Sequence, residues 1–347
     1  MKKRGLTLGL AAVMALSAIL TGCGTSSTQA TGTQASGGAG GQAETIELKF
    51  GHVLSQDSHF QVMANKMAEL AAAKSNGSIK ITVFPQSQLG GDSKMIQSMR
   101  TGVQALSITN QASLVNTVPE LTIFDLPYLF DSIDQANKVL NGPVGQKYLD
   151  LLPQHGLIGL GYLSVVERNV FANKAIHKPE DMKSLKLRTM QAPGHIKAYE
   201  LLGTQPTPMA YSEVYLSLQQ GVVDGGDTPP DQFIMDKFIE VAKYYNMTKI
   251  HYLPLILTMS KMQWDKMSPE QQKTVQEAAK EALAFQTEYY KKEYHDSLEK
   301  MKAAGVKVIE TDVNALKEQT SKAYDVILKD IPNGKQLLEE IEAAKKQ

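Results

Sequence analysis

The chain has 347 residues, of which 42% are hydrophobic and 21% are charged. This composition is typical of a globular protein and excludes a largely disordered chain, a collagen and a polytopic membrane protein, while the length favours about two domains. The 36 Lys and Arg residues balance the 36 Asp and Glu residues, which argues against a general nucleic-acid-binding protein. The single cysteine, Cys23, excludes a disulfide within the chain and any cysteine-rich metal site.

Residues 1–22 have the pattern of a secretory signal peptide. Three positive charges at positions 2–4 precede an apolar run from Gly5 to Leu20, which is shorter than the roughly 20 residues that span a membrane. The residues LTGC that end at Cys23 resemble a bacterial lipobox, which implies cleavage before Cys23 and acylation of its thiol. The alternative is an ordinary signal peptide with a cysteine at this place by chance.

The segment after the cysteine is predicted to be a tether. Residues 24–43 contain no charge and almost no large apolar side chain, so they cannot bury enough surface to become ordered. We therefore expect residues 23–43 to form an acylated, flexible link. The folded part would then work outside the cytoplasm, anchored by lipid to the cell membrane, in a periplasm or on an outer cell surface.

From Glu44 onward, predicted strands alternate with predicted helices. Ile46, Leu48 and Phe50 alternate with polar residues, as in a strand, whereas apolar residues between Ser58 and Ala73 recur at helical spacing. The alternation predicts βαβ units on a mostly parallel sheet. In chain order the pattern predicts strands at 45–53, 79–83, 105–109 and 157–166, and helices at 58–73, 92–100 and 132–152.

A second set of elements follows. We expect a strand at 185–188, a helix at 194–202 that ends at Gly203, a helix at 213–220 with Ser212 as N-cap, and a strand at 306–309. Between them, residues 269–303 form one long amphipathic pattern. A helix of that length spans about 52 Å, which is longer than one small domain, so it is expected to cross two lobes. The alternative is two helices with a break between them.

Motifs of common catalytic and cofactor sites are missing from the sequence. Gly159-Leu160-Gly161 lacks the third glycine of a dinucleotide-binding loop, and neither a phosphate-binding loop, a HExxH motif nor a GxSxG motif occurs. The seven histidines do not stand at metal-ligand spacing on one clear helix face. We therefore expect no cofactor, no metal site and no enzymatic activity.

Several long segments resemble a family of transport proteins. These segments are ITVFPQSQLGGDSKMIQSMRTG (81–102), PELTIFDLPYLF (119–130), KPEDMKSLKLRTM (178–190) and LLGTQPTPMAYSEVYLSLQQGVVDG (201–225). They are similar, in order and spacing, to the DctP-type solute-binding proteins of tripartite ATP-independent periplasmic (TRAP) transporters, and the resemblance covers nearly all of 45–310.

The resemblance implies an α/β, two-lobed, periplasmic-binding-protein-like fold of type II-like form, with the long helix bridging the lobes. It places 44–165 and 254–292 in lobe I, and 166–253 and 293–347 in lobe II. The chain is expected to hinge where it crosses between the lobes, near 165–168 and 250–254. The two lobes would close around a small organic acid.

The same resemblance implies the ligand-anchoring residue. Arg188 stands where the family has its anchoring arginine, and a planar guanidinium at a strand end suits a carboxylate because it donates two parallel hydrogen bonds. Arg168 matches a second arginine of the family. Glu167, beside it, is unusual for the family and is expected to pair with Arg168, weakening its hold on a ligand.

Other positions in the resemblance are expected to line the cleft. Thr228 takes the place of a family asparagine, which puts the identity of the ligand in doubt more than its class, because a hydroxyl is shorter and lacks the two donors of an amide. The remaining predicted ligand-binding residues are Tyr211 and Gln191 in the second lobe and His52, Asp92, Asn110 and Gln111 in the first.

The resulting hypothesis is an extracytoplasmic binding lipoprotein for a dicarboxylate or a sugar acid. It would deliver this organic anion to the small and large permease subunits of a TRAP transporter, with an ion gradient as the energy source. The leading alternative is a ligand-sensing subunit of a signalling receptor, and a third possibility is an enzyme built on the same scaffold.

Overall fold

The computed structural model describes residues 45–346. The predictions for the signal peptide at 1–22, for Cys23 and for the tether up to residue 43 lie outside the described residues. The described residues belong to one compact unit. Among them, no helix has both the length and the hydropathy that crossing a bilayer would require.

The first half of the chain follows the predicted alternation. One difference is that the helical pattern at 132–152 is divided at Gly142, because Pro143 cannot donate a backbone hydrogen bond and instead begins a new helix. The elements are β1 (Ile46–Gly51), α1 (His59–Lys74), β2 (Ile79–Phe84), α2 (Asp92–Arg100), β3 (Leu106–Asn110), α3 (Gln111–Leu114), η1 (Pro119–Asp125), α4 (Ile133–Leu140), α5 (Pro143–Leu149), η2 (Leu152–His155) and β4 (Leu157–Ala172).

The second half confirms the predicted helix that ends before Gly203, but Ser212 is not an N-cap. Ser212 lies inside a 3₁₀ turn, and it is Glu213 that accepts a hydrogen bond from the Ala210 amide, at 3.1 Å. The elements are η3 (Pro179–Met182), β5 (Lys186–Thr189), α6 (Pro193–Leu201), β6 (Gln205–Pro208), η4 (Tyr211–Glu213), α7 (Val214–Gln219), β7 (Gly225–Thr228), α8 (Pro230–Met235), α9 (Phe238–Val241), β8 (Tyr244–Ser260), α10 (Lys261–Trp264), α11 (Pro269–Ala303), β9 (Lys307–Glu310), α12 (Val313–Thr320), α13 (Lys322–Ile327), η5 (Leu328–Asp330) and α14 (Gly334–Lys345).

The described strands form a single sheet in the order β2-β1-β3-β8-β4-β7-β5-β6, with β9 paired to β8. Strand pairs at its ends are parallel, as predicted, but β8 lies antiparallel to β3 and β4, and β4 lies antiparallel to β7. The sheet is therefore mixed, and its centre differs from the mostly parallel sheet that the alternation predicts.

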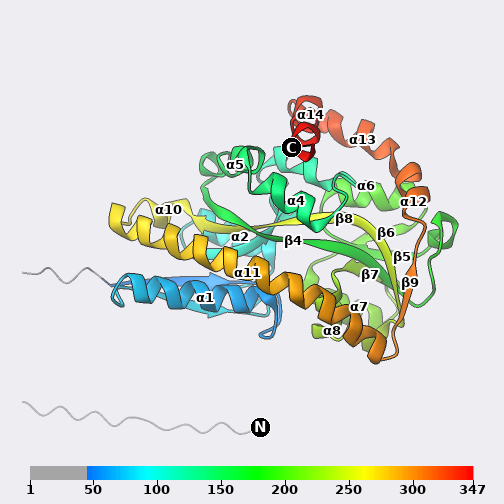
Figure 1. Ribbon diagram of the computed structural model, residues 1–347, viewed down its shortest axis with the longest axis horizontal. Coiled ribbons are helices and arrows are strands. Elements are labelled where there is room, and N and C mark those ends of the chain that lie inside the picture. The colour runs from blue at the N-terminus through cyan, green and yellow to red at the C-terminus, as the bar shows by residue number, and fades with distance from the viewer. Residues whose placement is uncertain (1–44, 347) are drawn as a thin grey trace, which may run out of the picture. The chain divides into compact units, whose positions relative to one another are not determined.

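The two central strands run through both halves of this sheet (Figure 1). The first part of β4, residues 157–163, pairs with the end of β8 beside β3, whereas the last part, residues 169–172, pairs with β7 and with the start of β8. The register of β4 against β8 shifts between Leu163 and Val166 and again between Arg168 and Val170. We call the β1–β3 side of these shifts the first half of the sheet and the β5–β7 side the second half.

Each half has its own hydrophobic core. A large cluster of buried side chains, among them Phe50, Met63 and Leu257, packs around the first half and also takes in Leu337 and Ile341 from α14. Two smaller clusters, one around Phe171 and Phe233 and the other around Ile176, Leu187 and Tyr199, pack in the second half.

Helix α11 links the two halves. It is one helix of 35 residues, so the alternative of two helices with a break is wrong. It packs against α1 in the first half and against α8 and β9 in the second (Figure 1). Its start is fixed by a capping box, in which the Ser268 hydroxyl accepts from the Gln271 amide at 3.2 Å and the Gln271 side chain accepts from the Ser268 amide at 2.9 Å.

We predict that Ser268→Ala lowers the free energy of unfolding by about 0.5–2 kcal/mol, because the first turn of α11 loses its side-chain acceptor. Ser268→Thr retains the hydroxyl and should lose much less. Urea denaturation of the three proteins measures the difference, and equal losses in the alanine and threonine variants would show that the cap does not stabilise α11.

Candidate ligand-binding site

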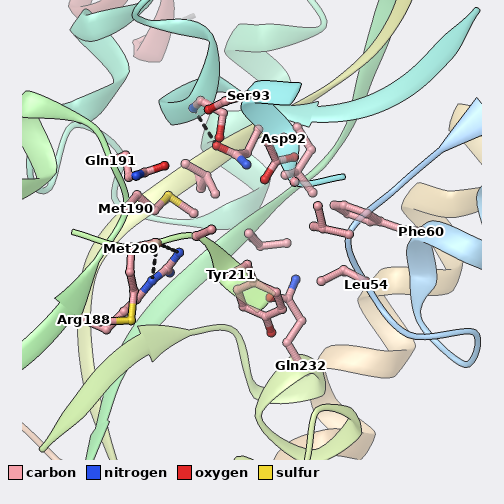
Figure 2. Close-up of a pocket in the computed structure, with 18 of the residues that line it drawn as sticks. Leu54, Phe60, Asp92, Ser93, Arg188, Met190, Gln191, Met209, Tyr211 and Gln232 are labelled. Atoms are coloured by element: carbon pink, nitrogen blue, oxygen red, sulfur yellow. Dashed lines mark hydrogen bonds between the residues drawn. The ribbon is translucent and has the colours of Figure 1, made fainter. Parts of the chain in front are cut away.

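A cavity of about 250 Å³ lies between the two halves of the sheet. One wall comes from the loop after β1, the start of α2 and the end of β3. The opposite wall comes from β5, from the segment that precedes α7, and from α8 (Figure 2). The lining residues are Val53, Leu54, Phe60, Gly91, Asp92, Ser93, Lys94, Asn110, Ser113, Asn116, Val166, Arg168, Arg188, Met190, Gln191, Met209, Ala210, Tyr211, Gln232, Leu253 and Leu255.

The structure brings six of the nine predicted ligand-binding residues to this cavity and leaves three outside its lining. The six are Arg188, Arg168, Tyr211, Gln191, Asp92 and Asn110, and the three are His52, Gln111 and Thr228.

The three residues outside the lining are buried and bonded to other parts of the protein. The His52 ring lies 3.1 Å from the Gln61 side chain, and burial lowers the pKa of His52 to about 4. The Gln111 amide donates to the Leu121 carbonyl and, at 2.6 Å, to the Asp125 carboxylate. The Thr228 hydroxyl donates at 3.0 Å to the side chain of Gln232, so it supports a lining residue without facing the cavity.

Arg188 is a buried guanidinium without a carboxylate partner. It stands near the end of β5, is 4% exposed, and donates to the Met209 carbonyl at 2.9 and 3.3 Å. Among residues 45–346 it makes no ion pair, and its guanidinium carbon lies 5.7 Å from the centre of the Tyr211 ring. Burial, with a further contribution from Arg168, lowers the pKa of Arg188 to about 10, so it is still charged at neutral pH.

Arg168 is also buried, but its charge is compensated. Its Nε donates to Asp227 at 2.6 Å, and its Nη2 donates to the carbonyl of the same residue, which lies on the neighbouring strand β7. Burial alone would lower the pKa of Arg168, but the adjacent Asp227 carboxylate raises it. The two arginines of the cavity therefore differ, because one is paired within the protein and the other is not.

The predicted pairing of Glu167 with Arg168 is wrong. Successive side chains of a strand point to opposite faces, so Glu167 lies on the other side of β4. There its carboxylate accepts hydrogen bonds from Tyr294 at 2.7 Å, from Tyr252 at 3.0 Å and from Asn169 at 3.0 Å. Glu167 therefore does not compete with a ligand for Arg168.

The opposite wall of the cavity carries an acidic group. Asp92 is the first residue of α2 and lies across the cavity from Arg188 (Figure 2). Burial raises the pKa of Asp92 to about 6, against the opposing effect of Arg188. Its Oδ1 is buried and has no hydrogen-bond partner in the described protein. On the same wall, the Asn110 side chain accepts from the Ser113 amide at 2.8 Å, which orients it.

Several lining residues were not predicted from the sequence. Ser93 and Lys94 follow Asp92 directly in α2, so they could have been predicted as lining residues from the position of Asp92. Asn116 and Gln232 lie outside any recognisable pattern. The apolar part of the lining includes Phe60 and Val166, which fall in a predicted helix and a predicted strand as ordinary core positions, and Leu255, for which no element was predicted.

Behind Arg168 lies a buried cluster of His195, Asp227 and His251, whose ligand atoms are within 4.8 Å of one another. The cluster is poorly suited to a metal ion. The two imidazole rings are stacked, with centroids 3.9 Å apart and planes 21° apart, so their in-plane lone pairs do not converge. The carboxylate of Asp227 already compensates the charge of Arg168. Burial is the main cause that lowers the pKa of His195, and the nearby His251 and the two arginines lower it further. A cation here would be repelled.

A buried contact between a histidine and a carboxylate joins the two sides of the cavity. His59 at the start of α1 lies 2.9 Å from the carboxylate of Asp231 in α8, and both side chains are fully buried. The Tyr290 hydroxyl of α11 donates to the same carboxylate at 3.4 Å. Asp231 immediately precedes the lining residue Gln232, so this contact fixes α8 against the first half of the sheet beside the cavity.

Comparison with known proteins gives a consistent result. Residues 50–330 match the model of the DctP family, described as bacterial extracellular solute-binding protein, family 7. The chain is 31% identical to the 2,3-diketo-L-gulonate-binding periplasmic protein of Escherichia coli over 85% of this chain and 91% of the relative. It is also 31% identical to the C4-dicarboxylate-binding periplasmic protein of Rhodobacter capsulatus, over 82% and 85%.

A solved structure is similar over almost its whole length. The sugar acid binding protein of Advenella mimigardefordensis, in complex with galactonate, superimposes with a TM-score of 0.85 at 31% identity. The match covers 87% of this chain and 98% of that protein.

The different states of the two arginines predict a large loss of ligand-free stability in one variant and little change in the other. Arg168→Ala leaves Asp227 buried and unpaired and should lower the free energy of unfolding by about 3–5 kcal/mol. Arg188→Ala removes a buried charge that has no carboxylate partner, so stability should change by no more than about 1 kcal/mol. Chemical denaturation of both variants compares them, and equal losses would contradict the assignment of paired and unpaired charges.

Proposed function

The chain belongs to the DctP family of bacterial extracellular solute-binding proteins, and from this premise we propose that its cavity captures a small organic acid through Arg188. It has the two-lobed fold of TRAP solute-binding proteins. The family supplies solutes to transporters and does not consist of enzymes, so this chain is a binding protein that works outside the cytoplasm.

The observation that carries the proposal is the unpaired guanidinium of Arg188. A buried charge is costly unless an opposite charge or hydrogen-bond acceptors compensate it, and a ligand carboxylate supplies both. The planar fork of Arg188 would donate two parallel hydrogen bonds to that carboxylate. Tyr211 would cover the bound group, because its ring already lies against the guanidinium.

The names of the relatives favour two ligand classes, sugar acids and C4-dicarboxylates. The polar side chains around the cavity, which include Ser93, Asn110, Asn116 and Gln191, suit either class because hydroxyl and amide groups both donate and accept. We propose that the ligand is an organic anion of one of these classes.

Binding is proposed to involve closure of two lobes about the crossings near 165–168 and 250–254. The register shifts of β4 support this position because they interrupt the sheet between its two halves. We propose that α14 belongs with lobe I, since it packs against α4, α5 and η1, whereas the sequence alone placed 293–347 in lobe II. The buried contact between His59 and Asp231 would hold the lobes together.

The protein would deliver its ligand to the small and large permease subunits of a TRAP transporter. We propose that acylated Cys23 and the tether up to residue 43 keep the folded part beside these subunits. The matched family is described as extracellular solute-binding proteins, and the relatives described above are named for the acids that they bind, which favours transport over a sensing subunit of a signalling receptor.

The central test removes the anchor. We expect Arg188→Ala to weaken binding by roughly 30-fold to several thousandfold, because truncating one partner of a buried charge pair costs about 2–5 kcal/mol. Arg188→Lys keeps the charge but loses the planar fork, so it should restore little of the affinity. A thermal-shift screen of sugar acids and C4-dicarboxylates selects the ligand, and calorimetry then measures the three affinities. Binding by Arg188→Ala within threefold of wild type would rule out the anchoring role.

A separate prediction concerns the membrane anchor. Wild-type protein expressed in a bacterial host should partition into detergent as an acylated species, whereas Cys23→Ser should be released or accumulate unprocessed, because the thiol that carries the lipid is gone. Detergent partitioning and mass spectrometry of the N-terminus measure both. A soluble wild-type protein with an unmodified N-terminus beyond residue 23 would show that there is no anchor.

A further inference from the structure

We propose that a second cavity, on the face of β4 opposite to the ligand cavity, binds a small zwitterion of the amino-acid class. The ammonium group of this molecule would bind Glu167, and its carboxylate would bind Lys249. The inference goes beyond the proposed function, because the residues that line this second cavity do not line the first.

The second cavity has a volume of about 380 Å³, within the range of about 300–1,000 Å³ that is usual for small-molecule sites. Val166 and Arg168 line the ligand cavity, whereas Glu167, between them, lines the second cavity, because successive side chains of a strand point to opposite faces. The other walls come from the segment that leads into α4, from β8 and from the middle of α11. The cavity therefore lies behind the place where β4 passes between the two halves of the sheet.

Glu167 is a buried carboxylate without a cation partner. It is 5% exposed, and within residues 45–346 it forms no ion pair. Its hydrogen bonds come from uncharged groups, the hydroxyls of Tyr252 and Tyr294 and the side-chain amide of Asn169. These bonds satisfy three of the roughly four lone-pair positions of a carboxylate and leave its charge unbalanced. An ammonium group would supply both the opposite charge and a further donor.

Lys249 brings the opposite charge to the same cavity. Its side chain is partly buried, and its ammonium group has no ion-pair or hydrogen-bond partner in the part of the chain that the structure describes. Glu167 and Lys249 thus face one cavity without contacting each other. A molecule between them that carries both charges would compensate both residues, which a simple anion or a simple cation would not do.

Asn169 fixes the two charged residues relative to each other. The register of β4 against β8 shifts at this point, so that residues 247–250 of β8 bulge out opposite Asn169. The Asn169 side chain donates to Glu167 at 3.0 Å and accepts from the Lys249 amide at 2.9 Å. Both charged residues are therefore held in place by the strands before any molecule binds, which lowers the entropy that binding must overcome.

Four further charged or titratable groups line the cavity, and all four are exposed to solvent, so that water and salt screen them. They are Asp131, Asp134, Lys291 and His295. Asp131 and Lys291 also have ion-pair partners of their own, at 3.4 and 3.0 Å. The field inside the cavity is therefore set mainly by one negative and one positive group, Glu167 and Lys249.

The test uses four probes that carry the same two charges at increasing separation: glycine, β-alanine, 4-aminobutyrate and 5-aminopentanoate. Calorimetry at neutral pH should show that at least one of them binds wild type. Glu167→Gln keeps an acceptor for the tyrosine hydroxyls but removes the charge, and Lys249→Met keeps an unbranched side chain without the charge. Each should weaken binding by about 10- to 100-fold, as expected for the loss of a hydrogen bond to a charged group. If Glu167→Gln fails to fold, Lys249→Met still decides, because the Lys249 ammonium group has no partner to lose.

Two controls locate the bound probe. Lys174→Met removes the same charge from an exposed site outside both cavities and should leave the affinity within threefold. Arg188→Ala should also bind the probe as wild type does. Loss of binding in Arg188→Ala together with full binding in Lys249→Met would place the probe in the ligand cavity and overturn the inference. Binding of none of the four probes by wild type, or unchanged binding in Lys249→Met, would overturn it as well, and the proposed function would stand in each case.

Discussion

The structure depends on how two buried guanidinium groups are compensated. Arg168 finds its carboxylate within the protein, because β4 and β7 lie side by side and bring it against Asp227. Among the described residues, Arg188 on β5 has no ion-pair partner, and its guanidinium donates to the Met209 carbonyl and lies beside the Tyr211 ring. Since a buried charge must be balanced, the first arginine stabilises the fold and the second leaves a place that an anion fills. The ligand thus completes an ion pair that the chain leaves open.

The position of the cavity follows from the two long central strands. Because β4 and β8 belong to both halves of the sheet, residues on their middle parts, such as Val166, Arg168 and Leu253, face the space between the halves. Helix α11 and the buried contact of His59 with Asp231 span the same space. These connections join two halves that have separate hydrophobic cores, and both halves contribute residues to the cavity between them. Closure about a ligand requires this arrangement.

Much of this arrangement could be predicted from the sequence, but not all of it. Helix α11 was predictable because its apolar positions recur along all of its 35 residues, and Arg188 was predictable because it lies at the end of a recognisable motif. Strand β8 was not, since a strand buried on both faces lacks alternation and this one contains Pro254. The wrong pairing of Glu167 with Arg168 came from adjacency in sequence, which in a strand means opposite faces. Three predicted ligand-binding residues lie on elements that border the cavity, but their side chains bind elsewhere in the protein. Thr228 bonds to Gln232, Gln111 to Asp125 and His52 to Gln61. Tertiary packing determines these partners, and the local sequence pattern does not reveal it.

The most direct measurement is a crystal structure of the protein with a bound sugar acid. The account predicts that both oxygens of the ligand carboxylate lie about 2.7–2.9 Å from the guanidinium nitrogens of Arg188, with the ion pair of Arg168 and Asp227 intact. A carboxylate bound at Lys94 and remote from Arg188, or an Arg168 that has left Asp227 to bind the ligand in its place, would contradict it.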